Sequence, residues 1–151
     1  MHGDARYKGV GTRTLKRNAK SSVDMDCQIS YNTPVLTKNS VRGPHIDDGA
    51  KIFGGLFYMR NPEDKASGGD FLVYDCKGAC KPLPRDKIKS SAGHNVHTQF
   101  GPSTVKVAKK VSYAANSLVI FINSKRAVHG VTPRSPSRYP RTFVNLIGNK
   151  R

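Results

Sequence analysis

The sequence predicts an all-β protein with few or no helices, of the double-stranded β-helix or jelly-roll (cupin-like) kind. Fourteen Gly and nine Pro in 151 residues indicate many turns and short elements. Apolar residues make up 36% and Trp is absent, so the core must be modest. The short apolar segments follow one another without a repeat and without strand–helix–strand alternation, which favours a jelly roll.

Eight segments are expected to be strands. Residues 25–31 and 104–113 alternate between apolar and polar side chains, as half-exposed strands do. The run SLVIFI at 117–122 is continuously apolar and predicts a buried strand. Gly54 and Gly55 inside 51–59 predict a bulge or close packing. The remaining strands are expected around His45 and at 70–75, 127–132 and 141–147.

The length suggests a single domain at 25–151, preceded by a basic N-terminal extension at 1–24. Residues 76–103 form a long loop insert, and such loops are usually functional or mobile. The insert contains Cys76, Cys80, His94 and His97, which could hold zinc. The C-x3-C spacing is loose and no second cysteine pair follows, so two loop cysteines and two surface histidines are the favoured interpretation.

The formal charge of +16 favours acidic partners, and nucleic acid is one of them. The 26 Lys and Arg are spread along the chain without a zinc finger or RNA-recognition motif, so a basic protein that stays soluble is the favoured interpretation. No apolar run is long enough for a transmembrane helix, and no secretory signal is seen. We therefore expect a cytoplasmic protein with three reduced cysteines and no membrane partner; the oligomeric state is not specified.

A candidate metal site begins at His45-Ile46-Asp47. In an extended segment residues i and i+2 project to the same face, so His45 and Asp47 can reach one ion while Asp48 points away. His129, in the strand after SLVIFI, is the third candidate ligand. Two imidazoles and one carboxylate leave positions open for substrate and dioxygen on Fe(II). Zinc accepts the same ligands, but its hydrolytic sites usually add a general base.

Arg141 opens the last strand and shares a face with Phe143 and Asn145. If that face lines the barrel, a buried guanidinium needs an anionic partner, and a dicarboxylate cosubstrate would provide one. A surface salt bridge is the alternative for Arg141, and Arg138 in the neighbouring Pro-rich loop competes for the role.

Residues 28–147 resemble the 2-oxoglutarate/Fe(II)-dependent dioxygenase superfamily, and most closely its prolyl 4-hydroxylase-like branch. The resemblance lies in VRGPHIDDGAKIFGGLFYMRNPEDKASGGDFLVYD and SLVIFINSKRAVHGVTPRSPSRYPRTFVNLIG. In order, these contain H-x-D, an apolar strand ending in Tyr, a Gly-Gly pair, an apolar strand, a distal His and an Arg. Relatives usually carry supporting helices before the first strand and often have a shorter His-to-Arg spacing, which leaves Arg138 and Arg141 open.

The resemblance implies that His45, Asp47 and His129 hold Fe(II) and that Arg141 pairs with the distal carboxylate of 2-oxoglutarate. Tyr58 would donate to that carboxylate, and Asn145 would lie beside it. Tyr31 would lie near the pocket. The implied reaction converts 2-oxoglutarate to succinate and CO2 while hydroxylating an unactivated C–H bond, with ascorbate as a reductant.

A peptidyl proline in a peptide or protein is the first expected substrate, by analogy with the prolyl 4-hydroxylase branch. Nucleic acid is a rival motivated by the charge, although no aromatic pair is placed to stack a flipped base. A small anionic metabolite is a third expectation. A non-catalytic jelly-roll binding module is the alternative from another functional class.

Overall fold

The computed structural model describes residues 7–12, 22–39, 42–76, 78, 81–83 and 98–150. This part of the chain is β-rich and contains one short 3-10 helix, η2, at Pro102–Thr104. Its strands are β1 (Tyr7–Thr12), β2 (Val23–Asn32), β3 (His45–Ile46), β4 (Lys51–Tyr58), β5 (Phe71–Cys76), β6 (Thr98–Gln99), β7 (Val105–Val111), β8 (Ser117–Ile122), β9 (His129–Val131) and β10 (Arg141–Lys150).

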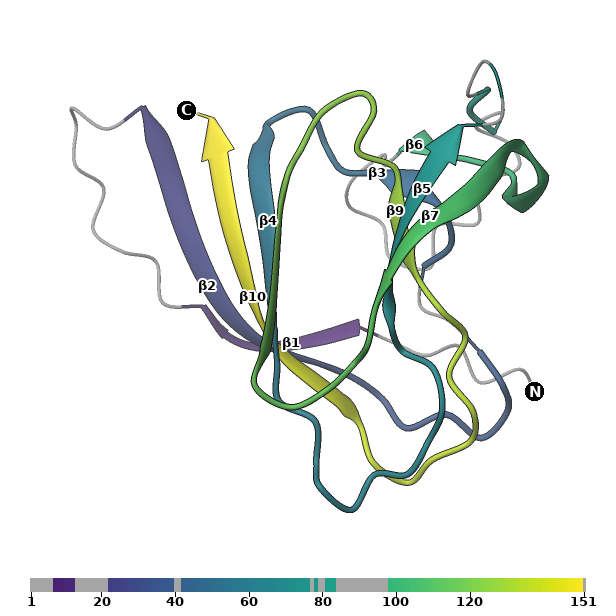
Figure 1. Cartoon of the computed structure of the whole chain (residues 1–151). Helices are drawn as coiled ribbons and strands as arrows, with labels where there is room; N and C mark the ends of the chain where they lie inside the picture. Colours follow the sequence, from purple (N-terminus) through teal and green to yellow (C-terminus); the bar gives the residue numbers. More distant parts are fainter. Residues whose placement is uncertain are drawn as a thin grey trace.

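The strands form two antiparallel sheets. The β10 sheet has the order β1-β2-β10-β4-β8, and the β9 sheet has the order β6-β3-β9-β5-β7. From β2 onward the chain alternates between the sheets, except that β5, β6 and β7 follow one another in the β9 sheet. The β10 sheet stands on one side of the molecule and the β9 sheet on the other (Figure 1).

All eight expected strands are present, and the structure adds two. β6 lies within the predicted insert, and β1 lies within the predicted N-terminal extension. Backbone pairing joins β1 to β2 in antiparallel register, so part of the predicted extension belongs to the β10 sheet. The run at 117–122 is not a fully buried strand, since Leu118, Ile120 and Ile122 are more than half exposed.

Two groups of buried side chains form the core. Tyr58, Phe71, Tyr113 and Phe143 make one group, and Phe100, Val105 and Val128 make the other. The first group receives side chains from both sheets, so burying it holds the sheets together.

Gly54 shows why β4 carries a glycine pair. A Cβ on Gly54 would lie 2.7 Å from the Phe121 ring on the neighbouring strand β8. The register of β4 with β8 is regular across both glycines, so the pair marks close packing and not a bulge. The missing side chain lets Phe121 lie flat across β4 and reach the centre of the protein.

Candidate active site

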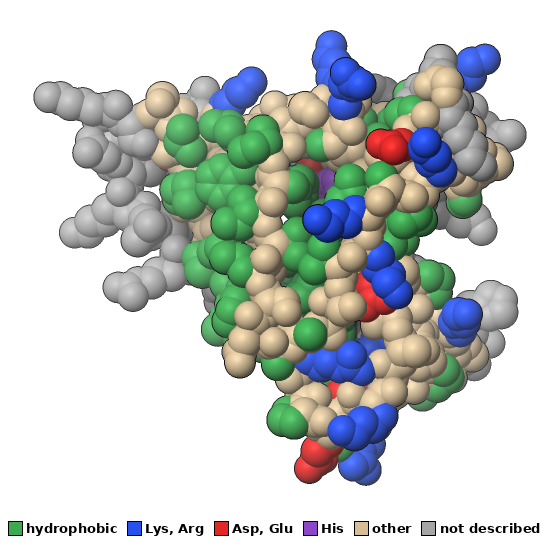
Figure 2. Space-filling view, viewed as in Figure 1, with side chains coloured by type: hydrophobic (Ala, Val, Ile, Leu, Met, Phe, Trp, Pro, Cys, Tyr) green, Lys and Arg blue, Asp and Glu red, His purple; other side chains and the backbone are tan. Residues whose placement is uncertain are grey.

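His45, Asp47 and His129 come together at the centre of the β9 sheet. His45 in β3 is the register partner of His129 in β9, and their ring centroids lie 4.3 Å apart. Asp47 follows β3 directly. All three side chains are buried, and each offers a ligand atom within 4.8 Å of the others. The structure thus brings together the three residues predicted as metal ligands. Figure 2 shows histidine surface beside an acidic side chain in an opening between the sheets.

Backbone carbonyls orient both imidazoles. His45 Nδ1 lies 2.8 Å from the carbonyl oxygen of Gly43, and His129 Nδ1 lies 2.9 Å from that of Ala127. A carbonyl can only accept, so each Nδ1 carries a proton, and Nε2 is the atom that bears a lone pair when the imidazole is neutral. The Nε2 atoms point at Asp47, at 3.6 Å from Oδ1 for His45 and 3.7 Å from Oδ2 for His129. This is the arrangement that metal-binding histidines adopt.

The charges around the three residues favour the protonation states that bind a cation. Burial alone would raise the pKa of Asp47, but His45 and Lys51 hold it well below its usual range. The Lys51 Nζ lies 2.8 Å from Asp47 Oδ2, and Arg42 lies 3.8 Å from Oδ1. Burial and the neighbouring His45 lower the pKa of His129 to about 4. At neutral pH the site therefore holds a carboxylate and a neutral imidazole at His129.

Aromatic rings seal the inner side of the histidine pair. Phe121 packs on His129 with 4.4 Å between centroids, and Phe71 stacks on the same imidazole at 5.5 Å. Phe71 also belongs to the core group that contains Tyr58 and Phe143. Phe71 therefore connects the histidine pair to the core on the inner face of the β10 sheet, where Arg141 lies.

Arg141 is the centre of a second polar region. It is 4% exposed at the start of β10, and its guanidinium lies between the rings of Tyr58, Tyr113 and Phe143 at 4.9, 5.1 and 4.9 Å. Arg141 Nε donates to the Gly69 carbonyl at 2.8 Å, and Nη1 faces Asn32 Oδ1 at 3.4 Å. No carboxylate of the described residues forms an ion pair with it. Burial lowers the pKa of Arg141, because the charged form is taken out of water.

Two buried polar atoms at this point have no hydrogen-bond partner among the described residues. They are Arg141 Nη2 and the Tyr58 hydroxyl. Tyr58 is completely buried, and burial raises the pKa of its hydroxyl, so it stays protonated and able to donate. A buried donor without an acceptor costs about 1–3 kcal/mol. Two such donors in one place indicate a position for an anion with several acceptor oxygens.

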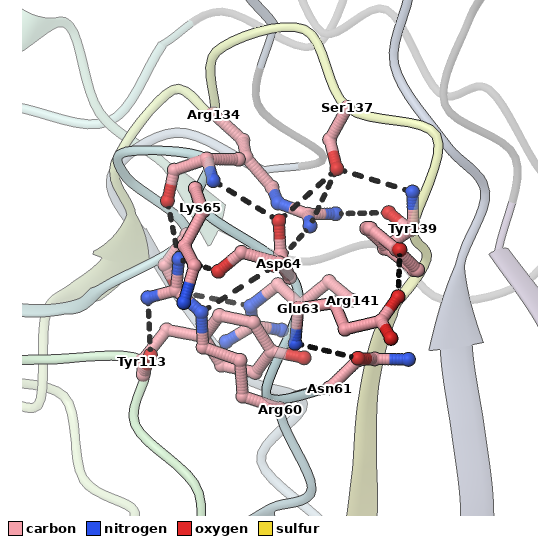
Figure 3. A network of polar contacts seen from close by, with 12 residues as sticks. Arg60, Asn61, Glu63, Asp64, Lys65, Tyr113, Arg134, Ser137, Tyr139 and Arg141 are labelled. Atoms are coloured by element: carbon pink, nitrogen blue, oxygen red, sulfur yellow. Dashed lines mark hydrogen bonds and ion pairs between the residues drawn. The ribbon is translucent and has the colours of Figure 1, made fainter.

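A polar network behind Arg141 holds its surroundings in place (Figure 3). The buried Asp64 pairs with Arg134, and Arg60 donates to the Asp64 and Ala66 carbonyls. Arg60 and Arg134 lie 5.4 and 5.9 Å from the centroid of the Tyr113 ring, which also contacts Arg141. Burial alone would raise the pKa of Asp64, but the Ala66 amide and Arg134 lower it. The network therefore fixes the ring against which the guanidinium packs.

The Gly68-Gly69 pair lies beside Arg141. Both residues have positive φ, and a Cβ on Gly68 would lie 2.0 Å from the Pro133 carbonyl oxygen. This close approach turns the Gly69 carbonyl toward Arg141 Nε. The second glycine pair of the sequence is thus part of the support for the guanidinium.

The other predicted site residues fall in different places. Asn145 is half-buried on the same face of β10 as Arg141, opposite Leu56 of β4. Tyr31 pairs with Thr142 and so lies on the opposite face of the sheet from Arg141. Arg138 is exposed and donates to the Tyr139 hydroxyl. Tyr31 and Arg138 therefore lie outside the pocket. Asp48 is exposed and accepts from the Ala50 amide, as expected for a residue pointing away from the ion.

Much of the predicted insert lies outside the described residues, including Cys80, His94 and His97. Cys76, at the end of β5, is disulfide-bonded. The prediction of three reduced thiols is therefore wrong for this residue, and a Cys76 thiolate cannot serve the alternative zinc site. Cys27 is a free, exposed cysteine.

Sequence patterns did not identify Asn32, Tyr113, Asp64 or Lys51 as site residues. Asn32 is the last residue of the alternating strand β2, and Lys51 follows Asp47 at a spacing of four. Neither position carries a motif, and their relevance comes from contacts across sheets. A buried Arg141 needs polar partners, and that requirement was the one signal in the sequence that could have prompted a search for Asn32.

No family model matches the chain, and the search of curated proteins finds no similar sequence. Within the described residues, no helix has the length and apolar character needed to cross a bilayer.

Proposed function

We propose that this protein is a 2-oxoglutarate- and Fe(II)-dependent dioxygenase of the prolyl 4-hydroxylase-like branch that hydroxylates an unactivated C–H bond. The observation that carries the proposal is the pairing of two buried regions. One is the His45/Asp47/His129 cluster, and the other is Arg141 with Tyr58, whose donors lack partners. The first region would hold Fe(II), and the second would hold the distal carboxylate of 2-oxoglutarate.

The topology supports a double-stranded β-helix for this proposal. Strands β2, β4, β8 and β10 alternate along the chain with strands of the other sheet, apart from β5, β6 and β7, which follow one another in that sheet. In this order β3 and β9 lie side by side, with the proposed ligands His45 and His129 on them and Asp47 directly after β3. The same order places β10 beside β2 and β4, which brings Asn32 and Tyr58 to Arg141.

The donor set fits Fe(II). His45, Asp47 and His129 would hold it through two imidazole nitrogens and one carboxylate oxygen, the donor set of non-haem Fe(II) oxygenases. Bound Fe(II) would supply the redox chemistry that couples oxidation of 2-oxoglutarate to hydroxylation of the substrate, with ascorbate as a reductant. The Gly43 and Ala127 carbonyls orient the imidazoles, and Lys51 holds one oxygen of Asp47, so that the carboxylate presents the other.

Arg141 and Tyr58 would bind the distal carboxylate of 2-oxoglutarate. Arg141 Nη2 and the Tyr58 hydroxyl donate, and the carboxylate oxygens accept. Nε is already committed to Gly69, and the three rings exclude water from the ion pair. The desolvated guanidinium gains a counter-ion only when the cosubstrate is present, which favours an anion over a neutral ligand.

A peptidyl proline is the substrate we propose first, by analogy with the prolyl 4-hydroxylase branch. Nucleic acid is the rival substrate, favoured by the net charge of +16. A small anionic metabolite, and a non-catalytic binding module, are the remaining alternatives. A binding module has no need for a buried cluster of metal-ligand type beside a buried guanidinium, which is why we place it last.

Uncoupled turnover tests the enzyme class without knowledge of the substrate. Fe(II), ascorbate and 2-oxoglutarate are added to the protein without oxygen, and the visible charge-transfer absorbance of an iron–2-oxo acid chelate is recorded. Air is then admitted and succinate is measured. We expect the absorbance first and succinate afterwards. Absence of both rules out the oxygenase and leaves the binding module.

Matched variants assign the two regions. Asp47→Ala should remove the absorbance, whereas Asp48→Ala, which changes the neighbouring exposed carboxylate, should retain it. Incubation of the active protein with peptide, nucleic-acid and metabolite pools then identifies the substrate class by a mass gain of one oxygen. A gain confined to nucleic acid would replace the peptidyl-proline assignment.

A further inference from the structure

The outer face of the β10 sheet is apolar over a continuous area. Three rows of side chains cross β2, β10, β4 and β8 on this face, each row following the register of the strands. In the first row Ile29, Val144, Phe57 and Leu118 are neighbours. The other two rows run Cys27, Leu146, Gly55, Ile120 and Met25, Gly148, Phe53, Ile122.

Close contacts confirm that these residues share one face. A Cβ on Gly55 would meet the side chains of Leu146 and Ile120, and a Cβ on Gly148 would meet the Phe53 ring. The face opposite carries Arg141, Phe143 and Tyr58, which are buried. Figure 2 shows hydrophobic side chains gathered over the side of the molecule where Figure 1 places β2, β10 and β4.

Exposure on this face is high for large apolar side chains. Ile29 is 55% exposed, Ile120 59% and Ile122 68%. Single exposed apolar residues are ordinary, but a contiguous area of them marks an interaction surface. None of the twelve positions in the three rows carries a charge, although the chain has 26 Lys and Arg. An acidic partner would be matched by basic residues here, so the occupant must itself be apolar and uncharged.

We propose that this face binds the same face of a second copy of the protein, forming a reversible dimer by sheet-on-sheet packing. A surface without charge is complementary to itself, because no like charges meet across a twofold axis. Two antiparallel sheets pack face to face about 10 Å apart with their apolar side chains interleaved. The Phe53 ring lies over Gly148, and Leu146 and Ile120 lie against Gly55, so side chains of the face itself fill the space that these glycines leave.

The size of the face determines the strength of the dimer. Four strands about 4.8 Å apart and three rows about 7 Å apart describe an area of roughly 20 by 20 Å on each copy. The pair would bury on the order of 800–1,000 Å², below the standard size of a permanent interface. The dimer is therefore concentration-dependent. The rest of each copy is strongly basic, so raising the salt concentration strengthens the dimer by screening repulsion.

Sedimentation equilibrium from about 1 to 500 µM protein tests the proposal. We expect a monomer–dimer equilibrium that shifts toward the dimer as salt increases. Ile120→Lys and Ile122→Lys should each weaken the dimer at least tenfold, since both residues are exposed and their replacement leaves the fold intact. Leu36→Lys is the matched control: Leu36 is 89% exposed and lies outside the strands, and this variant should dimerise like the original chain.

Cys27 gives an independent readout, because its exposed thiol lies in the middle row of the face. Its alkylation rate should fall as protein concentration rises, and Ile120→Lys should abolish that dependence. A monomer at all concentrations overturns the proposal, as does a dimer that survives both Lys variants. Binding of the monomer to neutral phosphatidylcholine vesicles, lost in Ile120→Lys, would also overturn it and assign the face to a lipid surface.

Discussion

Both faces of the β10 sheet depart from the usual pattern of a globular domain, in which polar groups are exposed and apolar groups are buried. The inner face buries Arg141, Asn32 and Ser30 together with the Tyr58 hydroxyl. The outer face exposes Ile29, and with it isoleucines of β8. Buried polar groups and exposed apolar groups both reduce the stability of the isolated chain.

The difference between the faces teaches where ligands act on this fold. The free-energy cost of burying the Arg141 guanidinium is offset when an anion with acceptor oxygens binds to it. The cost of exposing Ile120 to water is offset when another apolar surface covers it. The inner face therefore predicts affinity for a small charged ligand, and the outer face predicts affinity for a macromolecular surface. Substitutions that change one face and leave the other intact can separate these two roles.

The largest effect is expected at the three proposed metal ligands in and beside the β9 sheet. Asp47→Ala and His129→Ala would each remove one of them and should lower Fe(II) retention at least 100-fold. Iron content after desalting measures the loss. Asp48→Ala is the control and should keep its iron. If His129→Ala retains iron at the original stoichiometry, His129 is not a ligand.

Arg141→Met should lower 2-oxoglutarate affinity by about 10- to 100-fold, because hydrogen bonds to charged groups contribute about 1.5–3 kcal/mol. Met keeps much of the apolar contact with Tyr58 and Phe143 but cannot pair with a carboxylate. Fe(II) retention should not change, since Arg141 is not a ligand. The chelate absorbance titrated with 2-oxoglutarate measures the affinity.

Arg138→Met removes the same charge from an exposed side chain and serves as the control. It should bind 2-oxoglutarate as the original chain does. A loss in Arg138→Met equal to that in Arg141→Met would mean that overall charge, and not the buried pocket, determines binding.

The sequence predicts local features of this protein but not the contacts that depend on the order of strands in a sheet. Period-two alternation and the H-x-D spacing are local, so the strands and the pair His45 and Asp47 follow from neighbouring residues. Arg141 was predicted as an ion-pairing residue from its place at the start of a strand. That its guanidinium would lie between rings from β4, β10 and the β7–β8 turn depends on sheet order, which no local pattern contains.

SLVIFI illustrates the limit most clearly. Its continuous apolar run predicts a strand buried on both sides, and the structure places β8 at the edge of its sheet with alternate residues exposed. An apolar run predicts that both faces of the strand are covered. It does not predict whether the covering surface comes from the same chain.

The pH dependence of stability is the next effect in size, and it concerns His129 of the β9 sheet. An unfolded His has a pKa of about 6.5, and that of His129 in the fold is about 4. Between these values the unfolded chain binds more protons, so the contribution of His129 is complete above pH 6.5 and is lost as pH falls toward 4. The metal-free protein should be less stable by about 2 kcal/mol at pH 5 than at pH 8.

Urea unfolding at the two pH values measures this difference. His129→Gln removes the titrating group and should flatten the dependence in this range. The depressed pKa of Asp47 acts in a separate window, because that contribution is lost only below the ordinary carboxylate range near 3.8. An unchanged slope in His129→Gln would show that another group titrates.

The smallest effect is expected from removing single hydroxyls. It distinguishes the Tyr58 hydroxyl, proposed to bind a ligand, from the Tyr113 hydroxyl, which stabilises the fold. Tyr58→Phe removes a buried hydroxyl without a partner, so ligand-free stability should stay within about 0.5 kcal/mol or rise. Tyr113→Phe removes a hydroxyl that accepts from the Thr142 amide at 2.9 Å and should cost about 1 kcal/mol.

The order reverses for the cosubstrate. Tyr58→Phe should weaken 2-oxoglutarate binding about tenfold, the value of one charge-assisted hydrogen bond, whereas Tyr113→Phe should weaken it less, because its ring still packs against Arg141. Urea unfolding and the chelate titration measure the two quantities on the same samples. If Tyr58→Phe costs stability and leaves affinity unchanged, the Tyr58 hydroxyl serves the core, and the anion must be bound by Arg141 without it.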